Sequence, residues 1–470
     1  MAYRYGDDKN QMVFLPPSIE DYVSIDDPVR AYDAFVEALD LTKLGIEVNP
    51  SKVGNSSYAP KTMLKLLVYG YSYGETRSSR KLERALHHNL SFIWLTGNLK
   101  PDHKTIAEFR RKNRTALAKV LKECVRLCLK LDLIEGNTLF VDGTKIRANA
   151  SIKNAWTKER CQETLEATDR HIEELLNECE AIDASEEQQG SLTAMQEELS
   201  DKVKLKSKVN DILKELENQD KKAINTTDSE CGRMNSLQGS HAGYNVQSVV
   251  DQKHGLIVSM DPVNENNDRK QFVKQIQQAN ETLGKLCLTA CADAGYNTTD
   301  ELEKLEEQGI KPIAPPNEKS ENKKQFSYNA DEDYYLCPQG HRLKYSGLSA
   351  DQKSKIYRVT QKALCLSCDK FGTCTKSEYG KSVSRLIKED IRLRFEEEYL
   401  KPESREIYKL RQQKAELPFG HIKRNLGVNA FLLRGLKGVR AETSILGTCF
   451  NLRRMMTLLG VTVLIAKLTV

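Results

Sequence analysis

The sequence has no long hydrophobic run, and this absence argues against a membrane protein. Its most apolar stretch, Met455–Ala466, is far shorter than the roughly 20 residues that a transmembrane helix needs. The first residues, MAYRYGDDKNQ, contain no apolar segment of the kind found in a secretory signal peptide. We therefore expect a cytoplasmic protein with no membrane partner, in which the 12 cysteines do not form a disulfide framework.

The sequence also has little excess of charge of either sign. It contains 71 Lys and Arg residues against 66 Asp and Glu residues. A net charge of +5 spread over 470 residues does not by itself identify a polyanionic partner. A chain of this length is too long for one ordinary domain, and roughly two to four folding units are expected.

Residues 1–135 are predicted to form a helical N-terminal domain that binds DNA. Apolar residues recur at helical spacing in TMLKLLVYGYSYG and in TALAKVLKECVRLCLKLDLI. Two basic segments lie between them, TRSSRKLERALHHN and TIAEFRRKNR, and their cations either contact DNA phosphates or form a solvated helix face. His103 is interpreted as a structural polar residue. The candidates for DNA contact are Arg77, Arg80, Lys81, Arg110, Arg111 and Lys112.

Residues 136–470 are predicted to form a mixed α/β domain with one sheet. After a first strand, residues 153–225 are rich in charged residues and place apolar residues three and four positions apart, which is typical of a helical hairpin or coiled coil. The segments that follow predict two more strands, a helix, a strand, a helix and a last strand ending near residue 316. The helical segment is therefore interpreted as an insertion into the sheet.

Two aspartates lie at predicted strand ends. LFVDGTKIRANA places Asp142 at the end of the first strand, and CADAGY places Asp293 at the end of the fourth. If these strands are neighbours, the two carboxylates repel each other, and a hard cation such as Mg²⁺ or Mn²⁺ would hold both in their ionised form. The alternative is that each aspartate only caps a turn.

A third carboxylate is expected on a helix nearby. The candidate is Glu416 in YKLRQQKAELPFGHIKRNLG, which would share a helix face with Lys423, seven residues later. Pro418 indicates that the helix kinks or begins there. Glu442 is the alternative third ligand, and His421 is a candidate phosphate contact.

A second metal site is predicted within residues 317–385. The segments YYLCPQGHRLKY and ALCLSCDKFGTC place pairs of cysteines at turns, as in zinc ribbons, and tetrahedral Zn²⁺ needs four soft ligands. His341 could replace one thiolate. Reduced cysteines packed in a small core are the alternative. The expected ligands are Cys337, Cys365, Cys368 and Cys374.

The segments LFVDGTKIRANAS, GYNVQSVVD, CADAGY and YKLRQQKAELPFGHIKRNLG together resemble the DDE transposases of bacterial insertion sequences. The resemblance implies an RNase H-like core in which Asp142, Asp293 and Glu416 bind two Mg²⁺ ions. It also implies that Tyr408, Arg411 and Lys423 lie beside the third acid and contact DNA. Four residues separate Arg411 from Glu416, whereas the commonest pattern in the family has three.

The expected function is therefore transposition of a mobile element. Such an enzyme would bind the element's ends, cut the DNA strands and join the ends to target DNA, as a homo-oligomer on DNA in the bacterial cytoplasm at the nucleoid. Two other functions stay open. A metal-dependent nuclease would use the same acids without joining strands, and a non-catalytic DNA-binding relative would need neither step.

Overall fold

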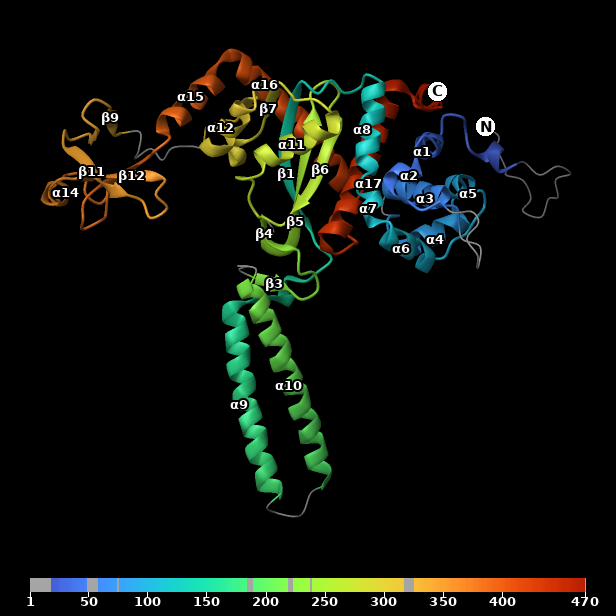
Figure 1. The fold of residues 1–470 in the computed structure, drawn as a ribbon, viewed down its shortest axis with the longest axis horizontal. Coiled ribbons are helices and arrows are strands. Elements are labelled where there is room, and N and C mark those ends of the chain that lie inside the picture. The colour runs from blue at the N-terminus through green and yellow to red at the C-terminus, as the bar shows by residue number, and fades with distance from the viewer. Residues whose placement is uncertain are drawn as a thin grey trace, which may run out of the picture.

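A computed structural model describes residues 18–48, 58–73, 76–183, 189–218, 223–236, 239–316 and 325–469. A six-stranded sheet forms the centre of the molecule (Figure 1). A helical unit packs on one side of it, a five-stranded sheet lies on the other, and a long helical hairpin projects away from both (Figure 1).

The six-stranded sheet matches the predicted mixed α/β class. Its strands run in the order β4-β5-β1-β7-β8, and β6 also pairs with β5. β1 is parallel to β7 and antiparallel to β5, and β8 is parallel to β7, so the first and fourth predicted strands are neighbours. The strand β4 was not predicted. The bounds are β1 (Thr138–Arg147), β4 (Gly232–Ser236), β5 (Gly239–Asp251), β6 (Ile257–Val263), β7 (Thr289–Cys291) and β8 (Lys311–Ile313).

Both faces of this sheet are covered, which explains why its strands read as apolar runs. Along β1, Leu139 and Val141 belong to the main core of the protein, whereas Phe140 packs with Cys291 in a smaller core beneath α16. Successive side chains of a strand point to opposite faces, so β1 supplies both cores. The helices that flank the sheet are α11 (Phe272–Leu283), α12 (Thr299–Glu307) and α16 (Pro402–Gly420).

The helical unit is joined to the sheet by a C-terminal helix. α17 (Gly435–Leu459) packs against α1, α3, α7 and α8 of the helical unit and against β6 of the sheet, so one buried core runs from Val23 to Leu468. The unit consists of a 3-10 turn (Ile19–Tyr22), α1 (Pro28–Glu37), α2 (Leu41–Leu44), α3 (Pro60–Ser72), α4 (Ser79–His88), α5 (Leu90–Leu95), α6 (His103–Lys112), α7 (Arg114–Leu117) and α8 (Val120–Lys130).

No single helix among the described residues is long and apolar enough to cross a membrane. The pair α17 and α18 (Val461–Leu468) passes the same length and composition test together, but the two helices are bent by 111°. Most of α17 is buried within the protein.

The inserted hairpin has a small core of its own. Its helices α9 (Lys158–Asp183) and α10 (Gln189–Asn218) rise from two short paired strands, β2 (Ala155–Thr157) and β3 (Ala223–Asn225). The predicted turn at 183–191 lies partly outside the described residues. Buried residues gather near the base of the hairpin, and Lys206 forms an ion pair of 2.6 Å with Asp169 across the two helices.

The cysteine-rich segment folds as a five-stranded antiparallel sheet in the order β13-β12-β11-β10-β9. One face carries a core that includes Leu343 and Tyr357. Residues 317–324 of the predicted segment lie outside the described residues. The elements are β9 (Ser327–Asn329), β10 (Tyr334–Leu336), β11 (Arg342–Leu348), β12 (Ser354–Val359), α14 (Ala363–Leu366) and β13 (Ser382–Leu386), followed by α15 (Glu389–Leu400).

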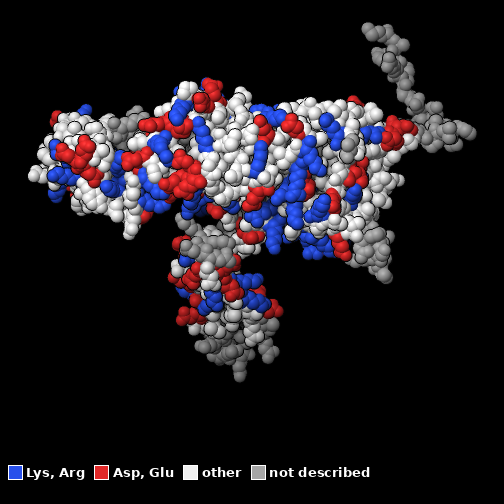
Figure 2. Space-filling view, turned by 45° about the horizontal axis from the view of Figure 1, so that its top comes forward, with Lys and Arg blue, Asp and Glu red and all other residues white. Residues whose placement is uncertain are grey.

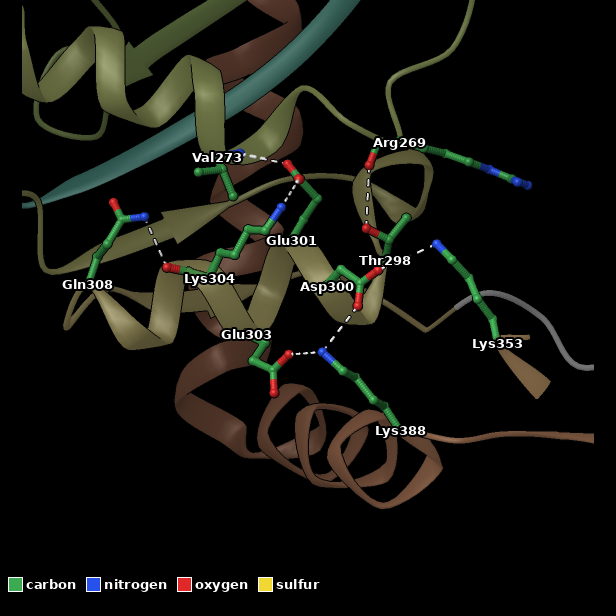
Figure 3. A network of polar contacts seen from close by, with 10 residues as sticks. All are labelled: Arg269, Val273, Thr298, Asp300, Glu301, Glu303, Lys304, Gln308, Lys353 and Lys388. Carbon is green, nitrogen blue, oxygen red and sulfur yellow. Dashed lines mark hydrogen bonds and ion pairs between the residues drawn. The ribbon is translucent and has the colours of Figure 1, made fainter. Parts of the chain in front are cut away.

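Two lysines attach this sheet to the first turn of α12. Lys353, in the turn between β11 and β12, lies 3.7 Å from a carboxylate oxygen of Asp300, and Lys388, just before α15, lies 3.3 Å from the other (Figure 3). Lys388 also forms an ion pair with Glu303. Exposed pairs of this kind contribute only about 0–1 kcal/mol each.

Candidate catalytic centre

Asp142 lies in the middle of β1, which corrects the prediction that it ends the strand. β1 continues to Arg147 because β5 pairs with it along its whole length, from Leu139 opposite Asp251 to Arg147 opposite Gly243. Asp142 shares a sheet face with Phe140, beneath α16, and its side chain is 14% exposed. Pairing with β5, where Asp142 lies opposite Ser248, therefore fixes the position of this carboxylate.

Asp293 follows the end of the neighbouring strand, as predicted. It comes two residues after β7, and its Oδ1 accepts a hydrogen bond of 2.8 Å from the backbone N–H of Gly295. This bond closes the short turn Ala294–Tyr296 and fixes the side chain. Asp293 can therefore cap this turn and also serve as a metal ligand.

Arg411 of α16 brings the two aspartates together. Its Nη2 atom lies 3.0 Å from Asp142 Oδ1 and 3.6 Å from Asp293 Oδ2. The guanidinium is buried among apolar groups, so it interacts strongly with both carboxylates. Two carboxylates that share one cation form a site for positive charge.

The environment of Asp142 makes ionisation costly. Burial raises the pKa of Asp142 to about 6, from an ordinary value of 3.8. The charges of Asp293 and Glu416 raise this pKa further, whereas Arg411 and the N–H of Gly143 lower it. A cation close to Asp142 would favour the ionised form.

The remaining predicted residues of the centre lie on α16 and its continuation. Glu416 is exposed on α16, and its charge reaches Asp142. The helix continues through Pro418 and widens into a π-helical turn at His421–Asn425. This turn places Lys423, whose Nζ donates a hydrogen bond of 2.5 Å to Thr144 Oγ1, two residues beyond Asp142.

Tyr408 and Lys423 respond to burial in opposite directions. Burial raises the pKa of the Tyr408 hydroxyl on α16, so the phenol stays neutral. Burial lowers the pKa of Lys423, and the charge of Asp142 opposes this effect. Both groups can donate hydrogen bonds to a phosphate that reaches the centre.

A fourth carboxylate, Asp268, was not found from the sequence. Its Oδ1 accepts hydrogen bonds from the side-chain amides of Asn245 (2.8 Å) and Gln247 (2.7 Å). Gly143 is required beside it, because a Cβ atom there would lie 2.6 Å from Gln247 Nε2 and 2.9 Å from Asp268 Oδ1. Tyr296 donates its hydroxyl to Gln247 from the turn after Asp293. The asparagine-rich loop before Asp268 has no periodic pattern that would have marked it.

Among the described residues, no three His, Cys, Asp or Glu side chains are close enough together to hold a metal ion as they stand. Asp142 and Asp293 meet at Arg411, and Glu416 does not complete a three-donor group with them. The donor set itself consists of carboxylate oxygens, which are the ligands that Mg²⁺ and Mn²⁺ prefer.

Glu442, the alternative third ligand, lies in a different place. It is fully buried on α17, where its Oε1 lies 2.8 Å from Arg77 Nη1 and its Oε2 accepts the backbone N–H groups of Leu432 and Leu433. Burial raises the pKa of Glu442, and Arg77 opposes this shift. These partners satisfy the carboxylate within the core.

Two of the six predicted DNA contacts are wrong for the same reason. Arg77 is 8% exposed because it pairs with Glu442, and Arg110 is 4% exposed, with its Nη1 atom 3.2 Å from the hydroxyl of Tyr71. Both arginines tie the helical unit together. They do not reach the surface where a phosphate would lie.

The other basic candidates are exposed. They comprise Arg80 and Lys81 on α4 and Arg111 and Lys112 on α6, and the latter two form ion pairs with Glu108.

The two candidate histidines, His103 and His421, both contact other side chains of the protein. His103 Nδ1 lies 2.8 Å from Glu83, in keeping with a structural role. His421 is half-buried and packs edge-on against Phe450, and burial lowers its pKa.

The four cysteines of the five-stranded sheet line one pocket with His341. Backbone N–H groups point at three of the sulfurs: His341 at Cys337 (3.3 Å), Lys370 at Cys368 (3.4 Å) and Lys381 at Cys365 (3.4 Å). Burial raises the pKa of Cys374, and the charges of the other three cysteines add to the effect. The four thiols therefore line the same pocket, although among the described residues they are not close enough together to coordinate a metal ion as they stand.

Comparisons with known proteins identify two parts of the chain. Residues 17–112 match a family described as a transposase domain (DUF772), and residues 336–456 match a family described as a transposase DDE domain. The second match contains Glu416 and Lys423 but not Asp142 or Asp293. No curated protein and no solved structure matches the chain. These two matches, at residues 17–112 and 336–456, indicate a DDE transposase of an insertion sequence.

Proposed function

We propose that this transposase cuts DNA strands at the ends of its element and joins them to target DNA, using Asp142, Asp293 and Glu416. The observation that carries the proposal is that Asp142 and Asp293, which come from the neighbouring parallel strands β1 and β7, both contact Nη2 of Arg411. Strand order supports an RNase H-like core, because three antiparallel strands are followed by two parallel ones beside the first.

The carboxylates fit divalent cations. Asp142 and Asp293 would hold Mg²⁺ or Mn²⁺, with Glu416 as the third ligand from α16. When bound, two such ions activate a water or a DNA 3′-hydroxyl and stabilise the leaving oxygen of a phosphodiester. A bound ion would also stabilise the ionised form of Asp142, which burial disfavours.

The neighbouring residues would position the DNA strand. Lys423 is held by Thr144 two residues from Asp142, where its ammonium can neutralise a phosphate next to the scissile bond. Arg411 keeps the two aspartates at a fixed separation and lies where the DNA backbone would approach them. Lys and Arg side chains also gather over the middle of the molecule, where the sheet meets the helical unit (Figure 2).

Joined DNA products test the proposal. The purified chain with Mg²⁺ and DNA that carries both element ends should yield cut ends and then target DNA joined to those ends. Cut ends without joined products would favour the nuclease alternative. Binding without cutting would favour the non-catalytic relative, and either outcome would overturn the proposed function.

We also propose that the cysteine pocket holds one structural Zn²⁺ ion. Backbone N–H groups directed at three sulfurs would stabilise thiolates, which are the form that binds Zn²⁺. Metal analysis of the purified chain should find one zinc ion per chain, and Cys365→Ser should reduce the content. Cys287→Ser is the matched control, because that thiol is buried beside the main sheet. Zinc-free wild-type protein would contradict the assignment.

A further inference from the structure

One face of the five-stranded sheet carries exposed residues on its three longest strands, β11, β12 and β13. Leu343, Tyr357 and Val383 point into the core on the opposite face and are buried. Their neighbours along each strand point outward, and among these Lys344, Arg358 and Ser382 are exposed.

A row of hydrogen-bond donors crosses this outer face. Strand register places the five residues of the row directly opposite one another on successive strands. With strands about 4.8 Å apart, the row is ~19 Å long, which exceeds the roughly 12 Å width of the DNA major groove. The row, from β9 to β13, consists of Asn329, Tyr334, Lys344, Arg358 and Ser382.

The third and fourth residues of the row are cations that face each other. Lys344 lies directly opposite Arg358, both are exposed, and neither forms an ion pair with a carboxylate of the described chain. Like charges directly opposite on a sheet destabilise the pairing. By contrast, Arg342 on the same face pairs with Glu332 at 2.8 Å and stacks over the ring of Tyr334. Lys344 and Arg358 are therefore available to bind an anion from outside the chain.

We propose that the outer face of this sheet, centred on Lys344 and Arg358, binds the sugar-phosphate backbone of duplex DNA. The occupant follows from charge complementarity: the row presents two cations and three neutral polar groups and no carboxylate. The proposal rests on the proposed function only for its choice of polyanion. It adds a second DNA surface, separate from the catalytic centre and from the helical unit.

Binding of the full chain to a fluorescein-labelled duplex of arbitrary sequence tests the surface. The measurement is made without added Mg²⁺ or Mn²⁺, so that no cleavage takes place, and without a chelator, so that the proposed Zn²⁺ ion stays in the sheet. Lys344→Glu/Arg358→Glu should weaken binding by about tenfold or more and lower the slope of log affinity against log salt by about two, since each lost phosphate contact removes about one. The control is Lys208→Glu/Lys214→Glu, which reverses two exposed charges on the projecting hairpin (Figure 1).

A single substitution separates binding from folding. Lys344→Glu places a carboxylate opposite Arg358, which replaces repulsion by attraction. Its melting temperature should equal or exceed that of the wild type, while its affinity for the duplex falls. A structural role for Lys344 would lower both together and would overturn the proposal.

The remaining outcomes are also decisive. Wild-type affinity in the double variant, or an equal loss in the hairpin control, would overturn the proposal. A changed oligomeric state with unchanged DNA affinity would do the same, because it would assign the face to a second copy. If the wild-type chain neither cuts nor joins DNA while Lys344→Glu still weakens binding, the proposed function fails and this surface stands.

Discussion

The two sheets of this protein place like charges in opposite settings. In the six-stranded sheet, Asp142 and Asp293 meet beneath α16, where Arg411 contacts both. In the five-stranded sheet, Lys344 and Arg358 face each other on an uncovered surface. Repulsion is strong where burial removes water and weak where water and salt screen it. Asp142, with only 14% of its side chain exposed, therefore needs a cation inside the protein, whereas the exposed cations Lys344 and Arg358 can bind an anion from outside.

Removing the charge of Asp142 should have the largest effect on DNA cleavage. Asp142→Asn keeps the size of the side chain but removes a charge that would hold a divalent ion, so Mg²⁺-dependent cleavage of element-end DNA should fall by several orders of magnitude. Binding of the same DNA should survive, because it depends on basic residues outside the centre. Gel assays of cleavage and binding measure both quantities.

Glu416→Gln should reproduce this loss, and a second acid on the same helix provides its control. Glu403 is exposed in the first turn of α16, so Glu403→Gln should cut normally. Normal cleavage by Glu416→Gln would remove this residue from the proposed triad.

Burial should also decide the effect of breaking an ion pair elsewhere in the chain. Glu442→Gln leaves Arg77 buried without its partner, and breaking a buried pair in this way costs about 3–5 kcal/mol. Glu108→Gln breaks the exposed pair with Arg111 and should change stability little. Urea unfolding of the two variants compares them, and similar midpoints would contradict the importance of burial.

Magnesium should stabilise the protein in a pH-dependent way. Burial raises the pKa of Asp142 to about 6 from 3.8, so its ionisation is less favourable in the folded state. In the metal-free protein, the contribution of Asp142 to stability should therefore fall as pH rises from about 4 to about 6.

Bound Mg²⁺ would reverse this penalty, because it favours the ionised carboxylate. Mg²⁺ should raise the melting temperature by a few degrees well above pH 6 and by much less below it. Asp142→Asn should abolish the difference between the two pH values. An equal Mg²⁺ effect in that variant would place the binding elsewhere.

The strands of the main sheet were predictable because they depend on local patterns. Apolar runs separated by helical segments predicted β1, β5, β6, β7 and β8 in this chain order. The pairing of Asp142 with Asp293 was conditional on the first and fourth strands being neighbours, and the structure meets this condition. The position of Asp142 within β1 was missed, because Gly143 reads as a turn. It is in fact a site where Gln247 and Asp268 leave no space for a side chain.

Long-range partners were not predictable. Arg77 lies on a basic segment that reads as a DNA surface, and its partner Glu442 is 365 residues away in the sequence. Asp268 gains its place beside the centre only through amides on β5. The strands β9 and β10 are three residues long, which is too short for an alternating pattern, so the cysteines alone marked that region.

The inserted hairpin should have the smallest effect on the sheet that carries the centre. Ala155 pairs with Asn225, and the N–H of Thr226 donates a hydrogen bond of 3.0 Å to the carbonyl of Asn154, so the two ends of the insertion already lie side by side. The core of the hairpin, with Cys161 and Leu216, is separate from the main core. Replacing residues 156–224 by an Asn-Gly hairpin turn should therefore leave a soluble protein whose melting temperature lies close to that of the wild type. Circular dichroism of the shortened chain measures this, and loss of soluble protein would show that the hairpin is part of the folding unit of the sheet.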